Sequence, residues 1–306
     1  MPDTQKRPPS SRPHKRITLQ DIANVAGVHI MTVSDALNGT GRVAVGTRKK
    51  IIQIAQELNY VPNATARALA TGRTNRIAIL SGALDYPYYA NLLHYLKELL
   101  DNRNYKMLLL KTPKEIHDLI YSTGSTEADG VIAIDMYDFG GEFGENSSTP
   151  CVSIGGHPRS SMDCVHIDLG AGVRQGLKLM IEEGCKRIAY LVTSQHMARL
   201  DQSRAKAYYE TMEEHGLTPE LINLDSGYMH LMPGIFTEYL KKHGAPEGLF
   251  CQNDEVAMCA FRTLNDAGFT VPKDVLMLGC DGQLHCSYFE PPLSSVAQPL
   301  QEISST

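Results

Sequence analysis

The stretch that most constrains the fold of this chain is 18–38, which reads TLQDIANVAGVHIMTVSDALN. Its first half has apolar residues spaced three, four and seven apart, which form one side of a short helix. These residues are Leu19, Ile22, Ala23 and Ala26. Thr18 is placed to cap the N-terminus of this helix, and Asp21 follows to complement the exposed N–H groups. We therefore expect a capped helix that begins just after Thr18.

The second half of the stretch predicts another short helix. Gly27 interrupts the apolar pattern, as a residue in a tight turn between two helices does. After the turn, Val33, Ala36 and Leu37 recur on one side. Two short helices joined by such a turn form a helix-turn-helix, whose second helix enters the major groove of DNA. An ordinary helical hairpin has the same pattern, so these residues alone leave both interpretations open.

The distribution of charge favours DNA binding over a plain hairpin. Residues 1–76 carry 12 Lys and Arg and 4 Asp and Glu, a net charge of +8. Residues 77–306 carry 17 and 30, a net charge of −13. Such asymmetry is expected when one end of a chain meets a polyanion and the rest stays away from it.

A third helix and a linker follow the helix-turn-helix. Thr47 is placed to cap this helix, whose apolar residues close a three-helix core: Ile51, Ile52, Ala55 and Leu58. At this point the sequence resembles the LacI/GalR family of bacterial transcription regulators. The matching pieces are AGV at the turn, TVS followed by ALN, the segment ELNYVPN and the linker ARALATGRTN. The resemblance extends from about Arg16 to the C-terminus and is most specific in its first part.

The resemblance implies a fold class, a domain order and a function. We expect an N-terminal all-α helix-turn-helix headpiece and an α/β periplasmic-binding-protein-like core of two doubly wound parallel-sheet lobes. The implied function is a ligand-responsive transcription regulator, a repressor that binds a palindromic DNA operator as a homodimer. The expected divisions are a disordered basic tail, the headpiece, a hinge and the effector-binding core: 1–14, 15–61, 62–75 and 76–306. The family continues beyond SSVAQPLQEISST through another helix and strand, so we expect a C-terminus that is short for the family.

The resemblance places the base-reading residues of the second helix at Ile30, Met31 and Asp35. The family usually has two polar residues and an arginine there, and commonly a serine in place of His29. Ile30 and Met31 can contact thymine methyl groups. Asp35 either accepts a hydrogen bond from a cytosine amino group or turns back to pair with a cation such as Arg42. The residues expected to contact DNA are Thr18, His29, Ile30, Met31, Thr32, Ser34, Asp35, Asn38, Arg42, Thr47, Tyr60, Asn63, Ala66 and Leu69.

Two further segments bear on DNA binding. Basic residues cluster around the start of the third helix, where they suit contacts to phosphates: Arg42, Arg48, Lys49 and Lys50. Residues 62–72 form a helix-capable segment too short to be stable alone. In the family this segment orders on DNA and a leucine wedges open a base step, a role that falls on Leu69 here. A plain flexible linker is the alternative.

From Arg76 onward, apolar strands alternate with helical patterns in two successive series, with strands expected at 76–80, 106–110, 130–134, 151–154, 187–192, near Leu221, 248–252 and 275–279. Helices are expected at 89–100, 115–121, 171–183, 204–215, 235–243 and 255–267. This alternation indicates parallel sheets with right-handed crossovers. Two series imply two lobes, with a ligand cleft at the carboxyl ends of the strands.

Polar residues just past the ends of these strands are the candidates for binding an effector. They are Tyr86, Tyr88, Asp168, Arg204, Asn253, Asp254 and Asp281. Carboxylates, amides, an arginine and aromatic rings together suit a sugar or a nucleobase. Two of these residues have a structural alternative, since Asp254 can cap the helix 255–267 and Asp281 can simply end a strand.

Other classes of protein fit the sequence less well. A solute-binding protein shares the core but needs a signal peptide, and the polar N-terminus lacks the apolar core of one. An enzyme is not indicated, because no G-x-S-x-G, P-loop or strand-linked G-x-G-x-x-G motif is present. The seven scattered cysteines indicate reduced thiols of a cytoplasmic protein. No cofactor or metal is expected, since the spacing of Cys280, His285 and Cys286 fits no common zinc pattern. No apolar run approaches the ~20 residues that span a membrane.

Overall fold

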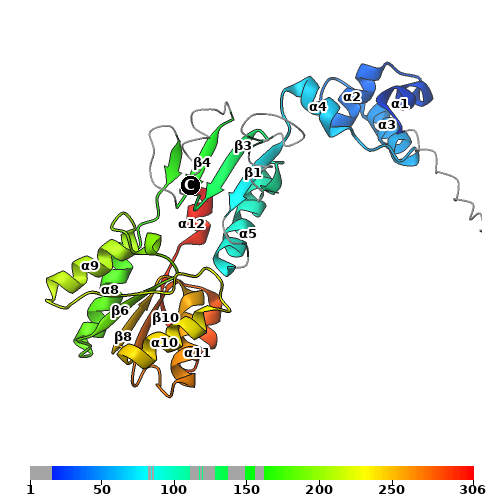
Figure 1. Ribbon diagram of the computed structural model, residues 1–306. Helices are drawn as coiled ribbons and strands as arrows, with labels where there is room; N and C mark the ends of the chain where they lie inside the picture. Colours follow the sequence, from blue (N-terminus) through cyan, green and yellow to red (C-terminus); the bar gives the residue numbers. More distant parts are fainter. Residues whose placement is uncertain are drawn as a thin grey trace, which may run out of the picture. The chain divides into compact units, whose positions relative to one another are not determined.

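The computed structural model describes residues 16–81, 84, 86–110, 117, 119, 128–136, 149–155 and 162–306. The predicted basic tail and almost all of the helix predicted at 115–121 lie outside the described residues. The chain divides into two compact units, Met1–Thr74 and Asn75–Thr306 (Figure 1).

The first unit contains the three-helix headpiece, formed by α1 (Leu19–Ala26), α2 (Ile30–Asn38) and α3 (Val45–Glu57). Thr18 caps α1 as predicted: its hydroxyl accepts from the backbone N–H of Asp21, and its own N–H donates to the Asp21 carboxylate at 2.8 Å. Gly27 ends the helix with a φ of 70°, in the left-handed region that favours glycine. One fully buried residue from each helix forms the centre of the core: Ile22, Val33 and Ile51.

The predicted cap of α3 is wrong. The helix begins at Val45 with Ala44 at the N-cap position, and no side chain accepts from its first N–H groups. Thr47 therefore lies inside the first turn. The reason is that Val43 packs against the headpiece core, so the chain enters the helix directly after that contact. Beyond α3, residues Ala64–Thr71 form α4, the short helix predicted for the hinge segment.

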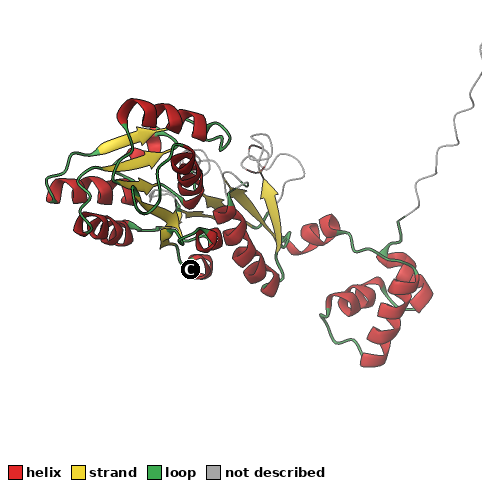
Figure 2. Ribbon diagram, turned by 90° about the horizontal axis from the view of Figure 1, so that it is seen from below, coloured by secondary structure: helices red, strands yellow, loops and turns green. Residues whose placement is uncertain are grey.

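The second unit contains two five-stranded sheets in which every described strand pairing is parallel. Lobe 1 has the strand order β2-β1-β3-β4-β5 and lobe 2 the order β10-β9-β8-β6-β7. Helices cover both lobes (Figure 2). The elements of lobe 1 are β1 (Arg76–Ser81), α5 (Pro87–Asn102), β2 (Lys106–Leu110), β3 (Gly130–Ile134), β4 (Cys151–Ile154) and β5 (Asp163–Val165).

Lobe 2 follows in one run and the chain then returns to lobe 1. Its elements are α8 (Gly170–Glu182), β6 (Ile188–Val192), η1 (Gln195–Ala198), α9 (Ser203–Glu214), β7 (Glu220–Asn223), α10 (Met232–His243), β8 (Gly248–Cys251), α11 (Asp254–Asp266), β9 (Leu276–Asp281), η2 (Leu284–Tyr288) and β10 (Ser294–Ala297). The last helix, α12 (Leu300–Ser305), packs beside α5, where Ile303 joins the core of lobe 1 (Figure 1). Residues at the carboxyl ends of strands in both sheets line a common pocket.

Aromatic residues form part of the core of lobe 2. All five residues of β6 are buried, and Tyr190 on this strand stacks on Phe250 of β8 with the ring centroids 4.7 Å apart. The hydroxyl of Tyr208 in α9 donates to the backbone oxygen of Ile188 at 2.8 Å, which ties the helix to the sheet. Within the described part of the chain, no helix is long and apolar enough to cross a membrane, and no three acidic, histidine or cysteine side chains are grouped to hold a metal ion.

A buried carboxyl group lies at the start of α11. Glu255 is 3% exposed, and neither of its carboxylate oxygens accepts a hydrogen bond from another residue in the described ranges. Burial raises the pKa of Glu255 to about 7, and the neighbouring charge of Asp254 contributes to this rise. The folded protein therefore holds a proton on Glu255 at pH values where the unfolded chain has released it.

This proton makes the stability of the protein depend on pH. Between its ordinary pKa of 4.5 and the folded value of about 7, the free energy of unfolding falls as the pH rises. We expect the Tm to fall over this range in the wild type and to fall less in Glu255→Gln. Part of the fall remains, because the pKa of Asp281 is also raised to about 7. Circular dichroism melts at several pH values measure both slopes.

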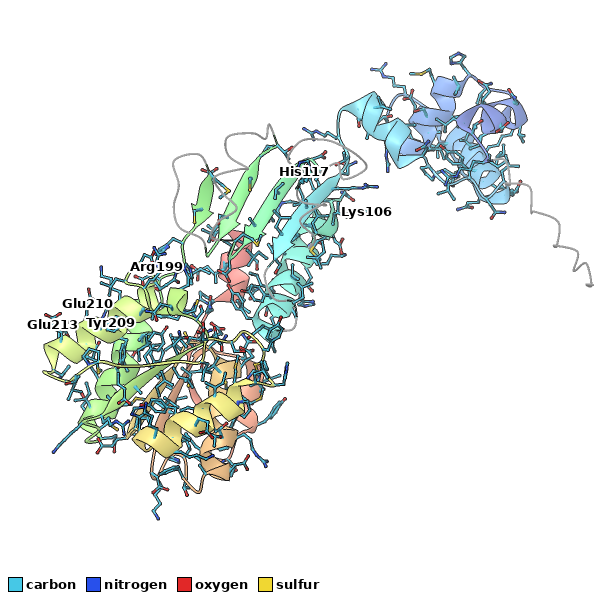
Figure 3. All side chains as sticks on the ribbon, viewed as in Figure 1. Lys106, His117, Arg199, Tyr209, Glu210 and Glu213 are labelled. Carbon is cyan, nitrogen blue, oxygen red and sulfur yellow. The ribbon has the colours of Figure 1, made fainter. Side chains whose placement is uncertain are left out.

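The control is Glu213→Gln, at an exposed residue of α9 (Figure 3). It should leave the dependence of the Tm on pH as in the wild type. Equal slopes for Glu255→Gln and the wild type would show that Glu255 is ionised in the folded protein.

Candidate nucleic-acid interface and ligand pocket

The outward side of α2 combines one apolar side chain with polar ones. Met31 is 61% exposed, and Asn38 donates from its amide to the hydroxyl of Ser34 at 3.3 Å. Ile30, predicted beside Met31 as a base reader, is half-buried and packs against the headpiece core. This packing leaves Met31 as the long apolar side chain on the side of α2 that faces away from the core.

Two other residues of the predicted reading surface make contacts within the headpiece. The Nδ1 atom of His29 accepts from the backbone N–H of Met31 at 3.3 Å, so His29 caps α2. The carboxylate of Asp35 turns back toward the loop between α2 and α3. It accepts a hydrogen bond from the hydroxyl of Thr40 at 3.2 Å. Asp35 therefore turns back into the headpiece, as one of the two alternatives predicted, but its partner is Thr40 and not Arg42.

The basic cluster around α3 divides into two kinds. Arg48 donates to the backbone oxygen of Thr40 at 3.2 Å, and Lys50 donates to the backbone oxygen of Ala26 at 3.3 Å. These two cations hold the turns of the headpiece. Arg42 and Lys49 are exposed, which leaves their charges accessible to a phosphate backbone.

The remaining predicted DNA contacts lie at helix ends and on α4. Thr18 is exposed at the start of α1, while Thr32 and Thr47 are half-buried. Burial raises the pKa of the Tyr60 hydroxyl. The side-chain oxygen of Asn63 accepts from the backbone N–H of Ala66 at 3.3 Å at the start of α4. Leu69 on the same helix is 83% exposed, which is unusual for a large apolar residue.

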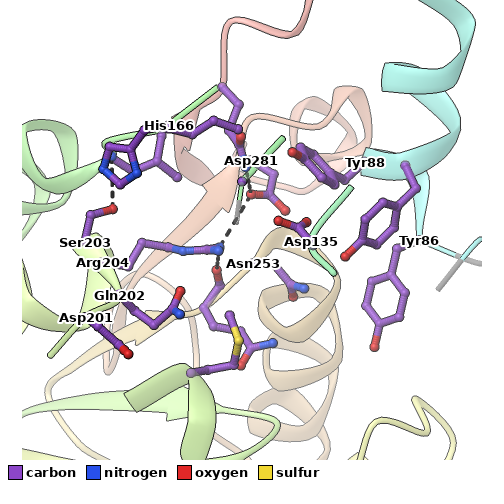
Figure 4. A pocket seen from close by; sticks show the side chains of 17 residues that line it. Tyr86, Tyr88, Asp135, His166, Asp201, Gln202, Ser203, Arg204, Asn253 and Asp281 are labelled. Atoms are coloured by element: carbon purple, nitrogen blue, oxygen red, sulfur yellow. Dashed lines mark hydrogen bonds and ion pairs between the residues drawn. The ribbon is translucent and has the colours of Figure 1, made fainter. Parts of the chain in front are cut away.

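A pocket of about 190 Å³ lies in the second unit, between the carboxyl ends of the two sheets (Figure 4). Five of the seven predicted effector residues line it: Tyr86, Tyr88, Arg204, Asn253 and Asp281. The structure therefore brings together side chains from α5 and its N-cap, α9, the start of α11 and the end of β9. The strand-end rule that predicted them accounts for this convergence.

The Arg204 side chain organises the lobe 2 side of the pocket. Its Nη1 atom donates to the backbone oxygen of Gln252 at 2.6 Å and lies 3.7 Å from Oδ1 of Asp281 (Figure 4). Gln298 donates from Nε2 to the same Asp281 oxygen at 2.6 Å. Burial raises the pKa of Asp281 to about 7 although the charge of Arg204 opposes this shift.

Gln298 also presents an unsatisfied acceptor. Its Oε1 atom is buried and has no hydrogen-bond partner among the described residues, and the residue lines the pocket. A buried amide oxygen that accepts no hydrogen bond costs free energy, so this position requires a donor. The pocket is therefore suited to a ligand that carries hydroxyl or amino groups.

Two predicted effector residues lie outside the pocket lining. Asp254 is fully buried, and its oxygens accept from the backbone N–H of Gln283 and the hydroxyl of Ser295 at 2.7 and 2.6 Å. It is not the helix cap either, because Asn253 accepts from the N–H of Val256 and caps α11. The helix starts one residue earlier than predicted, which moves the capping position to Asn253.

Asp168 is the second predicted effector residue that lies outside the pocket lining. Its carboxylate is exposed and accepts from the backbone N–H of Gly170 at 2.8 Å, a contact at the start of α8.

Several residues of the pocket were missed from the sequence. They are Tyr89, Asp135, Gly155, His166, Ile167, Leu169, Met197, Asp201, Gln202, Ser203, Gln252 and Gln298. Asp135 and Gly155 directly follow β3 and β4, so the strand-end rule could have found them. Gln298 follows β10, an edge strand that the sequence pattern did not reveal.

Comparison with known protein families agrees with this two-part organisation. The model of bacterial regulatory proteins of the lacI family matches residues 18–63, which cover the headpiece. The model of the periplasmic binding protein-like domain matches residues 177–306 in the second unit.

Curated relatives match nearly the whole chain. The HTH-type transcriptional regulator DegA of Bacillus subtilis is 28% identical, over 95% of this chain and 89% of its own length. The HTH-type transcriptional repressor PurR of Photobacterium profundum is also 28% identical, over 94% of this chain and 89% of its own length.

Solved structures share the fold. The Lac repressor dimer bound to operator and an anti-inducer has a TM-score of 0.80 at 20% identity, covering 95% of this chain and 90% of that one. The complex of the regulator CelR with cellobiose has a TM-score of 0.64 at 26% identity, covering 94% and 90%. The chain thus joins a helix-turn-helix domain of the lacI family of bacterial regulatory proteins to a periplasmic binding protein-like domain, and its relatives along nearly the whole length are HTH-type transcriptional regulators.

Proposed function

We propose that the protein is a repressor that binds a palindromic operator as a homodimer and responds to a small polar effector in the pocket between its lobes. The observation that carries this proposal is the pocket itself, which pairs Arg204 with Asp281 and presents the unsatisfied oxygen of Gln298. A regulator without an effector has no need of such a group of buried polar side chains, because each one costs free energy on folding.

The effector is a single-ring sugar or a nucleobase. Asp281 and Gln298 supply acceptors, Arg204 supplies donors, and Tyr86 and Tyr88 supply aromatic surface. At about 190 Å³ the cavity is smaller than the roughly 300–1,000 Å³ of sites for drug-sized ligands, which favours one ring over two. The structure of CelR contains cellobiose, which has the chemistry of a sugar although it has two rings.

The homodimer is supported by an exposed apolar surface on lobe 2. Its residues lie at α10, α11 and η2: Tyr228, Leu231, Ile235, Met258, Leu284 and Tyr288. The first two of these elements pack together, and Met258 and Tyr288 line one groove. Each side chain is at least 39% exposed, and exposed apolar patches are typical of protein–protein interaction sites. A second copy related by a two-fold axis covers the same surface on both subunits.

The first test is selection of bound duplexes from random DNA with the full-length protein, repeated with a panel of monosaccharides and nucleobases. We expect enrichment of two inverted half-sites, because a two-fold dimer imposes its symmetry on the operator. One member of the panel should change the amount of DNA bound. A single unrepeated half-site would contradict the dimer, and no enrichment at all would contradict sequence-specific binding.

A second prediction concerns the pocket. Arg204→Ala and Asp281→Asn should each weaken effector binding by about five- to a hundredfold, since each removes a buried partner of the ligand. DNA binding without effector should stay within a factor of about two. Isothermal titration calorimetry with the active panel member measures the first effect and gel shifts measure the second. Asp168→Asn is the matched control, because this carboxylate lies outside the pocket lining; a similar loss there would remove the pocket from the mechanism.

A third prediction concerns Leu69 on α4. An apolar side chain that is 83% exposed suits insertion between base pairs, which unstacks them and bends the duplex. Leu69→Ala should reduce both operator affinity and DNA bending, whereas Leu69→Met should retain them. Gel shifts on circularly permuted operator fragments measure the bend. An unchanged bend in Leu69→Ala would identify α4 as a plain linker.

A further inference from the structure

The chemistry of α2 limits which bases it can read. Residues 30–38 read IMTVSDALN and include neither lysine nor arginine. In the major groove, guanine is most often read by the donors of these two side chains. The helix therefore lacks the usual means of recognising guanine, and its specificity has to come from other groups.

Asp35 is occupied by the loop that follows α2. Besides accepting from Thr40, its carboxylate lies against the α-carbon of Gly41, where an added Cβ would come within 2.5 Å of Oδ2. Gly41 has a φ of +65° and needs to be a glycine on both grounds. Arg48 holds the same loop from α3 through the backbone oxygen of Thr40. Asp35 is therefore a positioning residue, which holds the loop between α2 and α3.

Met31 is left as the reading side chain. It lies one helical turn before Asp35, on the same outward side, and its backbone N–H is held by the His29 cap. Met31 is 61% exposed, and the other exposed residue within α2 is the polar Asn38. The one apolar group on the base edges of the major groove is the C5 methyl of thymine.

We propose that Met31 reads thymine methyl groups in each half-site, while Asp35 positions the loop and contacts no base. This inference rests on the proposed function, because it assumes that α2 enters the major groove. It assigns the specificity of the headpiece to apolar contact with A·T pairs.

The experiment removes single methyl groups from DNA. The probe is the duplex most enriched by the selection described above, and each thymine is replaced in turn by deoxyuridine, which lacks only the C5 methyl. For the wild type we expect one or two positions per half-site at which affinity falls about three- to fivefold. Met31→Ala should bind the unmodified duplex more weakly and show no further loss at those positions. Met31→Leu should retain the sensitivity.

A second arm tests Asp35. Asp35→Asn keeps an acceptor for the Thr40 hydroxyl and should recover the same preferred bases as the wild type. Asp35→Ala should weaken binding to all duplexes alike, without a change of preferred base, because the loop is loosened. Thermal melts of both variants show whether the headpiece still folds.

The outcomes separate this inference from the proposed function. If a duplex is enriched but deoxyuridine has no effect at any position, Met31 does not read thymine. If Asp35→Asn exchanges a preferred cytosine for another base, Asp35 is a reader and the assignment is overturned. If no duplex is enriched, sequence-specific binding itself fails and this inference fails with it.

Discussion

The second unit depends on the way in which the buried carboxylate of Asp281 is accommodated. A carboxylate with 6% exposure is tolerated only where donors and a counter-charge surround it. The counter-charge and the donor come from two separate segments, Arg204 in α9 and Gln298 after β10. The same group of residues forms the base of the pocket. The contacts that accommodate this carboxylate are therefore also contacts that shape the pocket.

The backbone is strained at Asp281, where the carboxylate is buried. Asp281 has a φ of 106°, in the region where side chains other than glycine are strained, and Gly282 follows at 67°. The hydroxyl of Ser295 accepts from the N–H of Gly282 at 3.0 Å and donates to Asp254 at 2.6 Å. Asp254, which the sequence suggested as a ligand residue, in fact supports this turn from beneath.

Much of the fold followed from local patterns in the sequence. The capped α1, the glycine turn and most of the strands could be predicted because each depends on residues within about ten positions. Thr47 and Asp254 were misjudged because a shift of one or two residues in a helix start moves the cap, and packing of Val43 or capping by Asn253 decides that shift. Gln298 could not be predicted, since its role depends on β10 pairing with β9.

The segment Asp281–Gln283 also joins the two lobes. Asn91 of α5 in lobe 1 donates to the side chain of Gln283 at 2.8 Å, only two residues from the carboxylate in the pocket. The backbone N–H of Gln283 donates to Asp254 at 2.7 Å, which ties the segment to the start of α11. The segment Asp281–Gln283 therefore connects occupancy of the pocket with the angle between the lobes. By linkage, if binding of a ligand changes the angle between the lobes, that angle in turn changes the affinity for the ligand, and the coupling free energy is the same in both directions.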